Sequence, residues 1–168
     1  MKTLHTLALA ILLSAAVPAA ALANPAVHTT RTCPGVTTAD IEGRFARLGE
    51  AWSTLDADAV TALFTAEPVL LPTVSNQPRT TPAGVRDYFV AFLKLKPVAR
   101  IDTSTIDIDC QTASRVGTWT VTLTDPVTGQ TRDVGARYSF IYRFEDGTWK
   151  VDHLHSSAMP EAAPPPAH

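Results

Sequence analysis

The spacing of hydrophobic residues changes once along the chain, close to Val98. Before this point apolar side chains recur every three or four residues, as they do on one face of a helix. The first such run consists of Ile41, Phe45, Leu48, Trp52 and Leu55. It predicts a helix of nearly five turns with a single buried stripe. Thr37, followed three residues later by Asp40, is typical of a helix start.

Two shorter helices are expected before the change of period. Asp56 is a candidate cap for the second helix. Its buried side is predicted to hold Val60, Leu63 and Phe64. The third helix begins at Thr81-Pro82, a cap followed by proline at the first helical position, and ends before Pro97. Residues at helical spacings along it are Val85, Tyr88, Phe89, Phe92 and Lys96. Between the second and third helices, residues 67–73 predict a short strand.

After Val98 the period becomes two, which is typical of strands. Four long strands are expected, with the last two joined by a turn at Asp146-Gly147. The apolar positions change parity between Ile101 and Ile106, which predicts a β-bulge. On the last strand, one face is expected to carry Trp149, Val151, His153 and His155. Helices followed by antiparallel strands predict the α+β class, here a cone-shaped single domain whose N-terminal helices pack on a curved antiparallel sheet.

Both ends of the chain differ in composition from the part between them. Lys2, the apolar residues 7–17 and the small-residue pattern Ala21-Leu22-Ala23 predict a signal peptide over residues 1–23. The alternative is an uncleaved anchor. We expect an arm at 24–36, the domain at 37–159 and a Pro/Ala tail at 160–168. The predicted location is exported, either periplasmic or secreted, with no membrane contact once the signal is cleaved.

Charge and cysteine content narrow the possible classes of function. Without Lys2, the chain has 13 basic and 16 acidic residues, a net charge of −3, so nothing predicts a nucleic-acid partner. Cys33 and Cys110 are the only cysteines. In an exported protein such a pair predicts a disulfide, and two unpaired thiols are the alternative.

Two segments carry a resemblance to a known family. The stretch Trp52-Ser53-Thr54-Leu55-Asp56 through Leu63-Phe64 resembles the opening of nuclear transport factor 2-like (SnoaL-like) domains. The end of the domain, 137–160, looks like a bacterial subgroup that is similar to the association (hub) domain of calcium/calmodulin-dependent protein kinase II. The resemblance implies a cone-shaped fold that dimerises through its sheet and can assemble into larger rings.

The resemblance also implies a deep polar pocket, which arginines line in the kinase hub. The hub arginine that directly follows its His-x-His motif is Ser156 here. A second hub arginine falls within Val121-Thr122-Leu123-Thr124, where this chain has none. The pocket is therefore expected without those two arginines.

Aromatic and basic side chains are the candidate ligand-binding residues. Phenol and indole groups combine apolar surface with a polar handle. The candidates are Trp52, Tyr88, Arg115, Trp119, Arg137, Tyr138 and Tyr142. For the aromatic members the alternative is packing in the core or at a dimer interface.

Three further residues could carry chemistry. Asp152 is a candidate general base if it faces the cavity, and a salt bridge to Arg137 or Arg115 is the alternative. His153 and His155 could contact a ligand or form half of a metal site, but they lack a third metal ligand and can equally bond within the sheet or a dimer interface. We expect no metal and no cofactor.

The sequence thus predicts an exported, SnoaL-like domain that binds a small molecule or serves oligomeric assembly without catalysis. Its expected partners are a second copy of itself, as a homodimer or larger ring, and an unidentified small molecule. The rival hypothesis is a small cofactor-independent isomerase, hydratase or cyclase that uses Asp152 as its pocket acid. Fold alone does not separate the two.

Overall fold

The computed structural model describes residues 33–160. The predicted signal peptide, the arm as far as residue 32 and the tail from residue 161 lie outside the described residues. Within 33–160 the elements follow in this order: α1 (Thr38–Ser53), α2 (Ala57–Thr61), β1 (Phe64–Leu71), α3 (Pro82–Phe92), the 3₁₀ turn η1 (Leu93–Leu95), β2 (Val98–Ile108), β3 (Thr112–Thr124), β4 (Thr131–Glu145) and β5 (Thr148–Ala158). The class is α+β, as predicted.

All three helices begin at the caps that the sequence indicates. Thr37 and Asp40 form a reciprocal capping box at α1, in which each side chain bonds the backbone N–H of the other residue. Asp56 accepts a hydrogen bond from the Asp58 N–H at α2. Thr81 caps α3 ahead of a proline in the first turn. These local bonds satisfy N–H groups that have no partner inside the helix.

The ends of the helices differ from the prediction. Leu55 is 49% exposed and has left-handed backbone geometry (φ 59°), because α1 stops at Ser53 and the chain turns towards α2. Lys96 is also left-handed (φ 44°) and does not extend the α3 stripe. Helix α2 ends at Thr61, and Phe64 opens strand β1 rather than closing a helix.

The five strands form one mixed sheet with the order β1-β5-β4-β3-β2. Strands β2 to β5 are antiparallel neighbours, as predicted, but β1 pairs with β5 in parallel. The predicted antiparallel arrangement is confirmed for the four long strands, and the parallel β1 makes the sheet as a whole mixed. A parallel pair needs a long connection, and here α3 and three strands separate its members along the chain.

Two bulges among the antiparallel strands set which of their side chains face the helices. The predicted bulge in β2 lies between Ile101 and Thr103. A second bulge, in β5, was not predicted: Tyr142 of β4 pairs with Val151 and Ile141 pairs with His153, so Asp152 is an extra residue.

The extra residue reverses the alternation along β5. Val151 is buried, and the next buried positions are Leu154 and Ser156. His153 and His155 therefore share a face with each other but not with Trp149 and Val151. The predicted four-residue face is wrong because one bulged residue exchanges the two sides of a strand.

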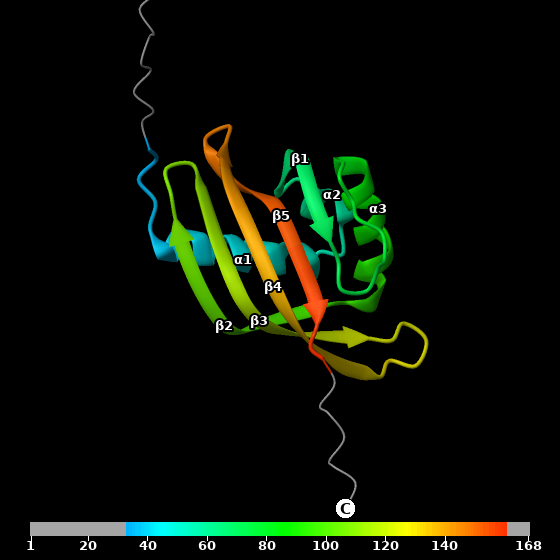
Figure 1. The fold of residues 1–168 in the computed structure, drawn as a ribbon. Coiled ribbons are helices and arrows are strands. Elements are labelled where there is room, and N and C mark those ends of the chain that lie inside the picture. Colours follow the sequence, from blue (N-terminus) through cyan, green and yellow to red (C-terminus); the bar gives the residue numbers. More distant parts are fainter. Residues whose placement is uncertain (1–32, 161–168) are drawn as a thin grey trace, which may run out of the picture. The chain divides into compact units, whose positions relative to one another are not determined.

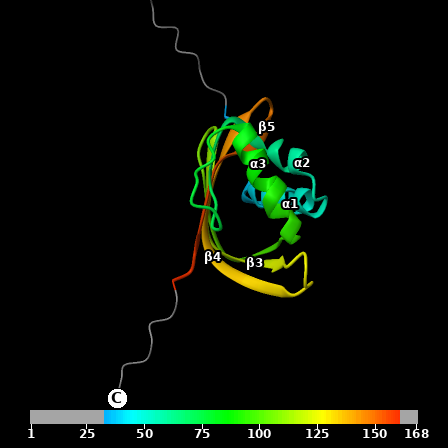
Figure 2. The same cartoon turned by 90° about the vertical axis from the view of Figure 1, so that its right-hand side faces the viewer.

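The helices all lie on one side of the sheet, which curves around them. Figure 2 shows α1, α2 and α3 on the concave side, with the far ends of β3 and β4 bending towards them. Helix α1 crosses behind the strands in Figure 1. The core between the two layers is aromatic: Phe45 of α1 contacts Trp119 and Phe140 of the sheet, and Phe140 stacks on Tyr142.

A disulfide joins Cys33, just before α1, to Cys110 in the turn between β2 and β3. The predicted pairing is confirmed. A bridge that closes a loop of this length stabilises the fold by about 4 kcal/mol on the loop-entropy model. Among residues 33–160, no helix is both long and apolar enough to span a membrane.

Candidate functional site

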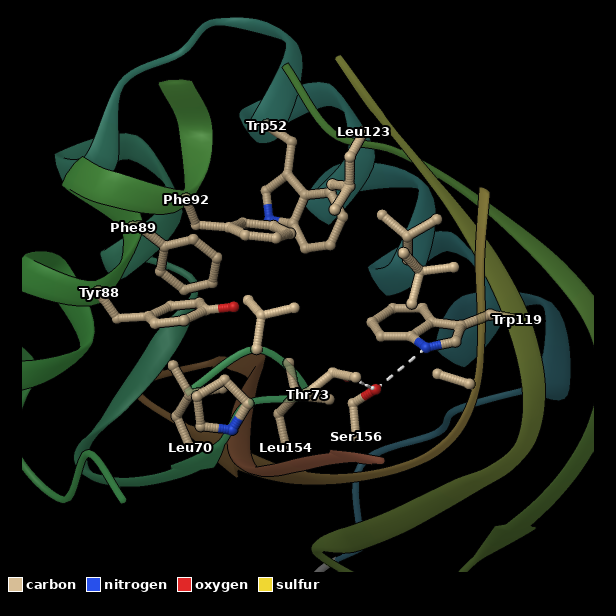
Figure 3. Close-up of a pocket in the computed structure, with 15 residues that line it drawn as sticks. Trp52, Leu70, Thr73, Tyr88, Phe89, Phe92, Trp119, Leu123, Leu154 and Ser156 are labelled. Atoms are coloured by element: carbon tan, nitrogen blue, oxygen red, sulfur yellow. Dashed lines mark hydrogen bonds between the residues drawn. The ribbon is translucent and has the colours of Figure 1, made fainter. Parts of the chain in front are cut away.

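A pocket opens between α3, the end of α1 and the concave face of the sheet (Figure 3). The empty space between its walls is about 480 Å³, counting the part open to solvent. The aromatic and aliphatic side chains of its walls leave a narrow cleft between them. Its 15 lining residues are Trp52, Leu70, Pro72, Thr73, Val74, Tyr88, Phe89, Phe92, Trp119, Val121, Leu123, Val134, Ala136, Leu154 and Ser156.

Aromatic rings form two facing walls of this pocket. Tyr88, Phe89 and Phe92 come from α3 and lie on one side in Figure 3, and Trp119 of β3 lies opposite them. Trp52 of α1 joins the walls, since its ring contacts both Phe92 and Trp119. Facing aromatic walls favour a flat, apolar ligand.

The floor of the pocket carries a hydrogen-bonded group centred on Ser156. Its hydroxyl oxygen accepts one bond from Trp119 Nε1, at 3.2 Å, and another from the Thr73 hydroxyl. Both acceptor positions of Ser156 are thus filled, and its own O–H hydrogen remains available. Ser156 is 7% exposed, so this hydrogen is a sheltered donor at the pocket floor.

Two more donors come from the aromatic walls. The hydroxyl of Tyr88 points into the cavity (Figure 3). Burial raises the pKa of Tyr88 above the ordinary phenol value, so this group stays neutral and protonated. The indole N–H of Trp52 is buried and has no hydrogen-bond partner within residues 33–160. A ligand that carries an acceptor oxygen would satisfy the Tyr88 hydroxyl.

No lining residue carries a carboxylate, an imidazole or a basic side chain. Tyr88 is the single titratable group in the set, and its raised pKa makes it a hydrogen-bond donor rather than a base. The pocket therefore suits recognition of an uncharged molecule. It contains no group with which to abstract a proton near neutral pH.

Asp152 lies outside this pocket, on the opposite face of the sheet. It accepts hydrogen bonds from Arg143, at 2.9 Å, and from the hydroxyl of Thr65, at 3.2 Å. The expected salt bridge is present, but its partner is Arg143 rather than Arg137 or Arg115. Asp152 does not face the cavity, which was the condition for its role as a base, because the bulge at this residue directs Leu154 inward in place of the neighbouring polar side chains.

His153 and His155 also lie on the outer face and do not line the pocket. His153 pairs in register with Ile141 and Val69, and His155 pairs with Ser139 and Leu71. Residues 33–160 contain no group of three or more His, Cys, Asp or Glu side chains arranged to hold a metal ion.

The other predicted ligand residues divide between wall, core and surface. Trp52, Tyr88 and Trp119 line the pocket. The Tyr138 hydroxyl is occupied, since it donates to the Thr103 carbonyl at 2.9 Å. Arg137 is exposed on the outer face. Arg137 and Tyr138 are therefore not part of this pocket.

Arg115 and Tyr142 are buried behind the pocket rather than in its wall. Arg115 is 6% exposed; its Nε donates to the Ser104 hydroxyl at 3.0 Å, and its guanidinium lies 5.3 Å from the centre of the Phe45 ring. Tyr142 is 1% exposed and stacks on Phe140. Neither is among the 15 lining residues.

Comparison with known families identifies the family to which this chain belongs. A model of the SnoaL-like domain matches residues 45–151, which is more than half of the chain. The chain belongs to the SnoaL-like family. None of the curated proteins matches the sequence significantly.

Solved structures of several SnoaL-like and related proteins resemble this one. A Xanthomonas campestris protein, named for the calcium/calmodulin dependent protein kinase II association domain, is 37% identical; the match covers 79% of this chain and 98% of that one, with a TM-score of 0.71. The resemblance to this subgroup is confirmed. A nuclear transport factor 2-like protein of Salmonella enterica is 16% identical over 74% of this chain and 92% of its own (TM-score 0.65). A protein of Streptomyces avermitilis, named as a dehydratase of the same family, is 10% identical over 73% and 97% (TM-score 0.66). The last two show the fold alone.

Proposed function

We propose that this SnoaL-like domain binds a small, uncharged, largely apolar molecule with acceptor oxygens, and that it does so without catalysis. The observation that carries the proposal is the composition of the pocket. Flat aromatic walls surround two donors, on Tyr88 and Ser156, and no lining side chain is charged. Ring compounds with a carbonyl or ether oxygen match this combination.

The rival function, a small isomerase, hydratase or cyclase, has no base at this pocket. Asp152 was its candidate, and that carboxylate is bonded to Arg143 and Thr65 on the far side of the sheet. An anionic intermediate would also meet a narrow apolar cleft with no cation in its walls. Binding is the function that these contacts support.

Location and assembly complete the proposal. We place the protein outside the cytoplasm, because the signal-like start of the sequence agrees with a disulfide, which persists in oxidising compartments. We further propose a homodimer that pairs through the outer face of the sheet, where β-branched and aliphatic side chains such as Val116 (39% exposed) and Ile141 lie between polar ones.

Binding of 1-indanone, a flat neutral ketone, tests the pocket by isothermal titration calorimetry. Indane is the matched ligand without the acceptor oxygen. We expect indanone to bind about tenfold or more tightly than indane, since one or two buried donors gain a partner only with the ketone. Equal affinity of the two, or no binding of either, would remove the basis of the proposal.

A matched pair of variants locates the binding. Val74 lines the pocket and is 48% exposed, so it lies at the rim, and Val74→Trp should close the opening without disturbing the core. Val127→Trp places the same side chain in the β3–β4 turn, where Val127 is 90% exposed. We expect indanone binding to be lost in the first variant and retained in the second. Loss in both, or retention in both, would place the ligand elsewhere.

A further inference from the structure

A second recess lies between α1 and the first residues of β5. Its empty space is about 390 Å³, counting the part open to solvent, and it shares no lining residue with the pocket described above. Its walls include Arg44 and Arg47 of α1, Tyr142 of β4, and Thr148 and Lys150 of β5. Three of its side chains are cationic and none is anionic.

The two arginines are three residues apart on α1, so their side chains lie on neighbouring parts of one helix face. Arg44 Nη1 donates to the Thr148 hydroxyl at 3.3 Å, and neither guanidinium forms an ion pair with any residue of 33–160. Asp40, one turn before Arg44, directs its carboxylate to Thr37. Most of the N–H groups of Arg44 and Arg47 are therefore available to a ligand.

Lys150 contributes less charge than its position suggests. Its ammonium is 3.0 Å from the Asp146 carboxylate and 3.5 Å from that of Glu145. These two acids do not line the recess. The unbalanced positive charge of the recess therefore comes from Arg44 and Arg47.

Tyr142 supplies the observation that separates a binding site from a solvated surface. The residue is 1% exposed and lines the recess, yet its hydroxyl has no hydrogen-bond partner within the described residues. Burial raises the pKa of this phenol, against the opposing effect of the nearby Arg115 and Arg44, so the O–H stays protonated. A buried donor without an acceptor is uncommon in folded proteins and points to a missing partner.

Arg115 adds a positive charge behind Tyr142. This guanidinium is almost completely buried, its Nη1 has no partner among residues 33–160, and no carboxylate of that range pairs with it. A buried charge without a counterion is costly. An anion placed beside Tyr142 would lie in the combined field of Arg115, Arg44 and Arg47.

We propose that this recess binds the carboxylate or phosphate group of a small molecule. Arg44 and Arg47 act as the charged donors, and the Tyr142 hydroxyl is the buried neutral donor. Guanidinium groups match the planar fork of a carboxylate and the oxygens of a phosphate. The competing view is that water satisfies Tyr142 and that the two arginines only keep the surface soluble.

Inorganic phosphate and acetate are the probes, titrated into the full chain by calorimetry at constant ionic strength, with chloride as the balancing anion. We expect saturable binding of at least one of them. Arg44→Gln should weaken it about tenfold, and Arg47→Gln by several-fold, because each removes a charge-assisted hydrogen bond. Arg132→Gln is the control, since it removes one exposed cation at the start of β4, from a residue that lines neither cavity. Binding of neither probe, or equal losses in the control, would overturn the proposal.

The change in stability caused by Tyr142→Phe distinguishes an anion-binding hydroxyl from a structural one. If the hydroxyl serves to bind an anion, its removal should leave the stability in chloride unchanged or slightly higher. The substitution should also reduce the stabilisation that phosphate or acetate gives. If the hydroxyl only serves the fold, stability should fall by the same amount with and without the probe, which contradicts the proposal. Val74→Trp should bind the anion normally, so failure at this recess is distinguishable from failure at the apolar pocket.

Discussion

The two faces of β5 carry different kinds of residue and face different surroundings: the inner face borders the apolar pocket, and the outer face carries the charged and imidazole side chains. Leu154 and Ser156 point inward and form the floor of an apolar pocket, while Asp152, His153 and His155 lie on the outer face. The residue types that usually indicate chemistry do not line this apolar pocket. The side with the pocket uses a leucine and a serine. Residue type alone is therefore a poor guide to the site here, and the strand's alternation decides it.

The difference depends on a single residue. Without the bulge at Asp152, the alternation that starts at Trp149 and Val151 would direct both histidines into the cavity. With it, the histidines leave the cavity and Ser156 enters, where it accepts bonds from Trp119 and Thr73. The four predictions below test this assignment of faces, from the largest expected effect to the smallest.

Truncation of adjacent residues on the two faces should give very different losses of stability. Leu154 is 3% exposed, and Leu154→Ala should lower the free energy of unfolding by about 2–5 kcal/mol, because it leaves a cavity in the pocket floor. His155→Ala, on the exposed side, should change it by less than about 0.5 kcal/mol. Urea unfolding measures both. Similar losses for the two variants would contradict the assignment of faces.

The adjacent serines offer a finer version of the same comparison. Ser156→Ala leaves the buried indole N–H of Trp119 without an acceptor and should cost about 1–3 kcal/mol. It should also weaken indanone binding. Ser157→Ala removes a hydroxyl from the other face and should alter neither property measurably. Equal effects of the two substitutions, in unfolding and in calorimetry, would show that Ser156 is not the inward residue.

Asp152→Asn should have a small effect. The carboxylate pairs with Arg143, which is 56% exposed in its side chain, and such ion pairs contribute at most about 1 kcal/mol. Ligand binding should be unchanged, since the residue does not line the pocket. A loss of binding or of an enzymatic activity in this variant, with the fold intact by circular dichroism, would restore the role of Asp152 as a pocket acid.

The affinity for indanone should not vary with pH between 5 and 9. Tyr88 is the one titratable lining residue, and its raised pKa keeps it neutral across this range. If an imidazole contacted the ligand, affinity would change between pH 5 and 8. Calorimetry at several pH values separates the two cases. The same series on Val127→Trp, which should bind indanone normally, is the control. A clear inflection near neutrality would place a histidine at the site.

The sequence predicted most of the elements because local rules determine them. The caps at Thr37, Asp56 and Thr81, the period-two strands and the bulge near Ile101 all follow from short-range patterns. Ser156 was noted in the sequence only as the position where an expected arginine is missing, and its place in the wall of this pocket was not predicted. Trp52, Tyr88 and Trp119, three of the predicted ligand residues, line this pocket, and their contact with a ligand stays a prediction.

What the sequence could not show depends on contacts between distant segments. The parallel pairing of β1 with β5 joins residues about as far apart as Val69 and His153. The bulge at Asp152 has no glycine or proline to indicate it, and it is defined by its two partners on β4. Thr73 and Val74 come from an irregular loop whose path depends on packing. The basic recess combines a helix and two strands, so no local motif could reveal it.

The central claim is that the inward face of β5 belongs to a pocket for an uncharged ligand. Native mass spectrometry of protein purified gently from its own source tests this most directly. We predict that the wild-type protein and Val127→Trp retain a small molecule and that Val74→Trp does not. The released molecule should have a mass that corresponds to a compound without an ionisable group. A ligand retained equally by all three proteins, or a strongly acidic one lost from Val74→Trp, would contradict the account.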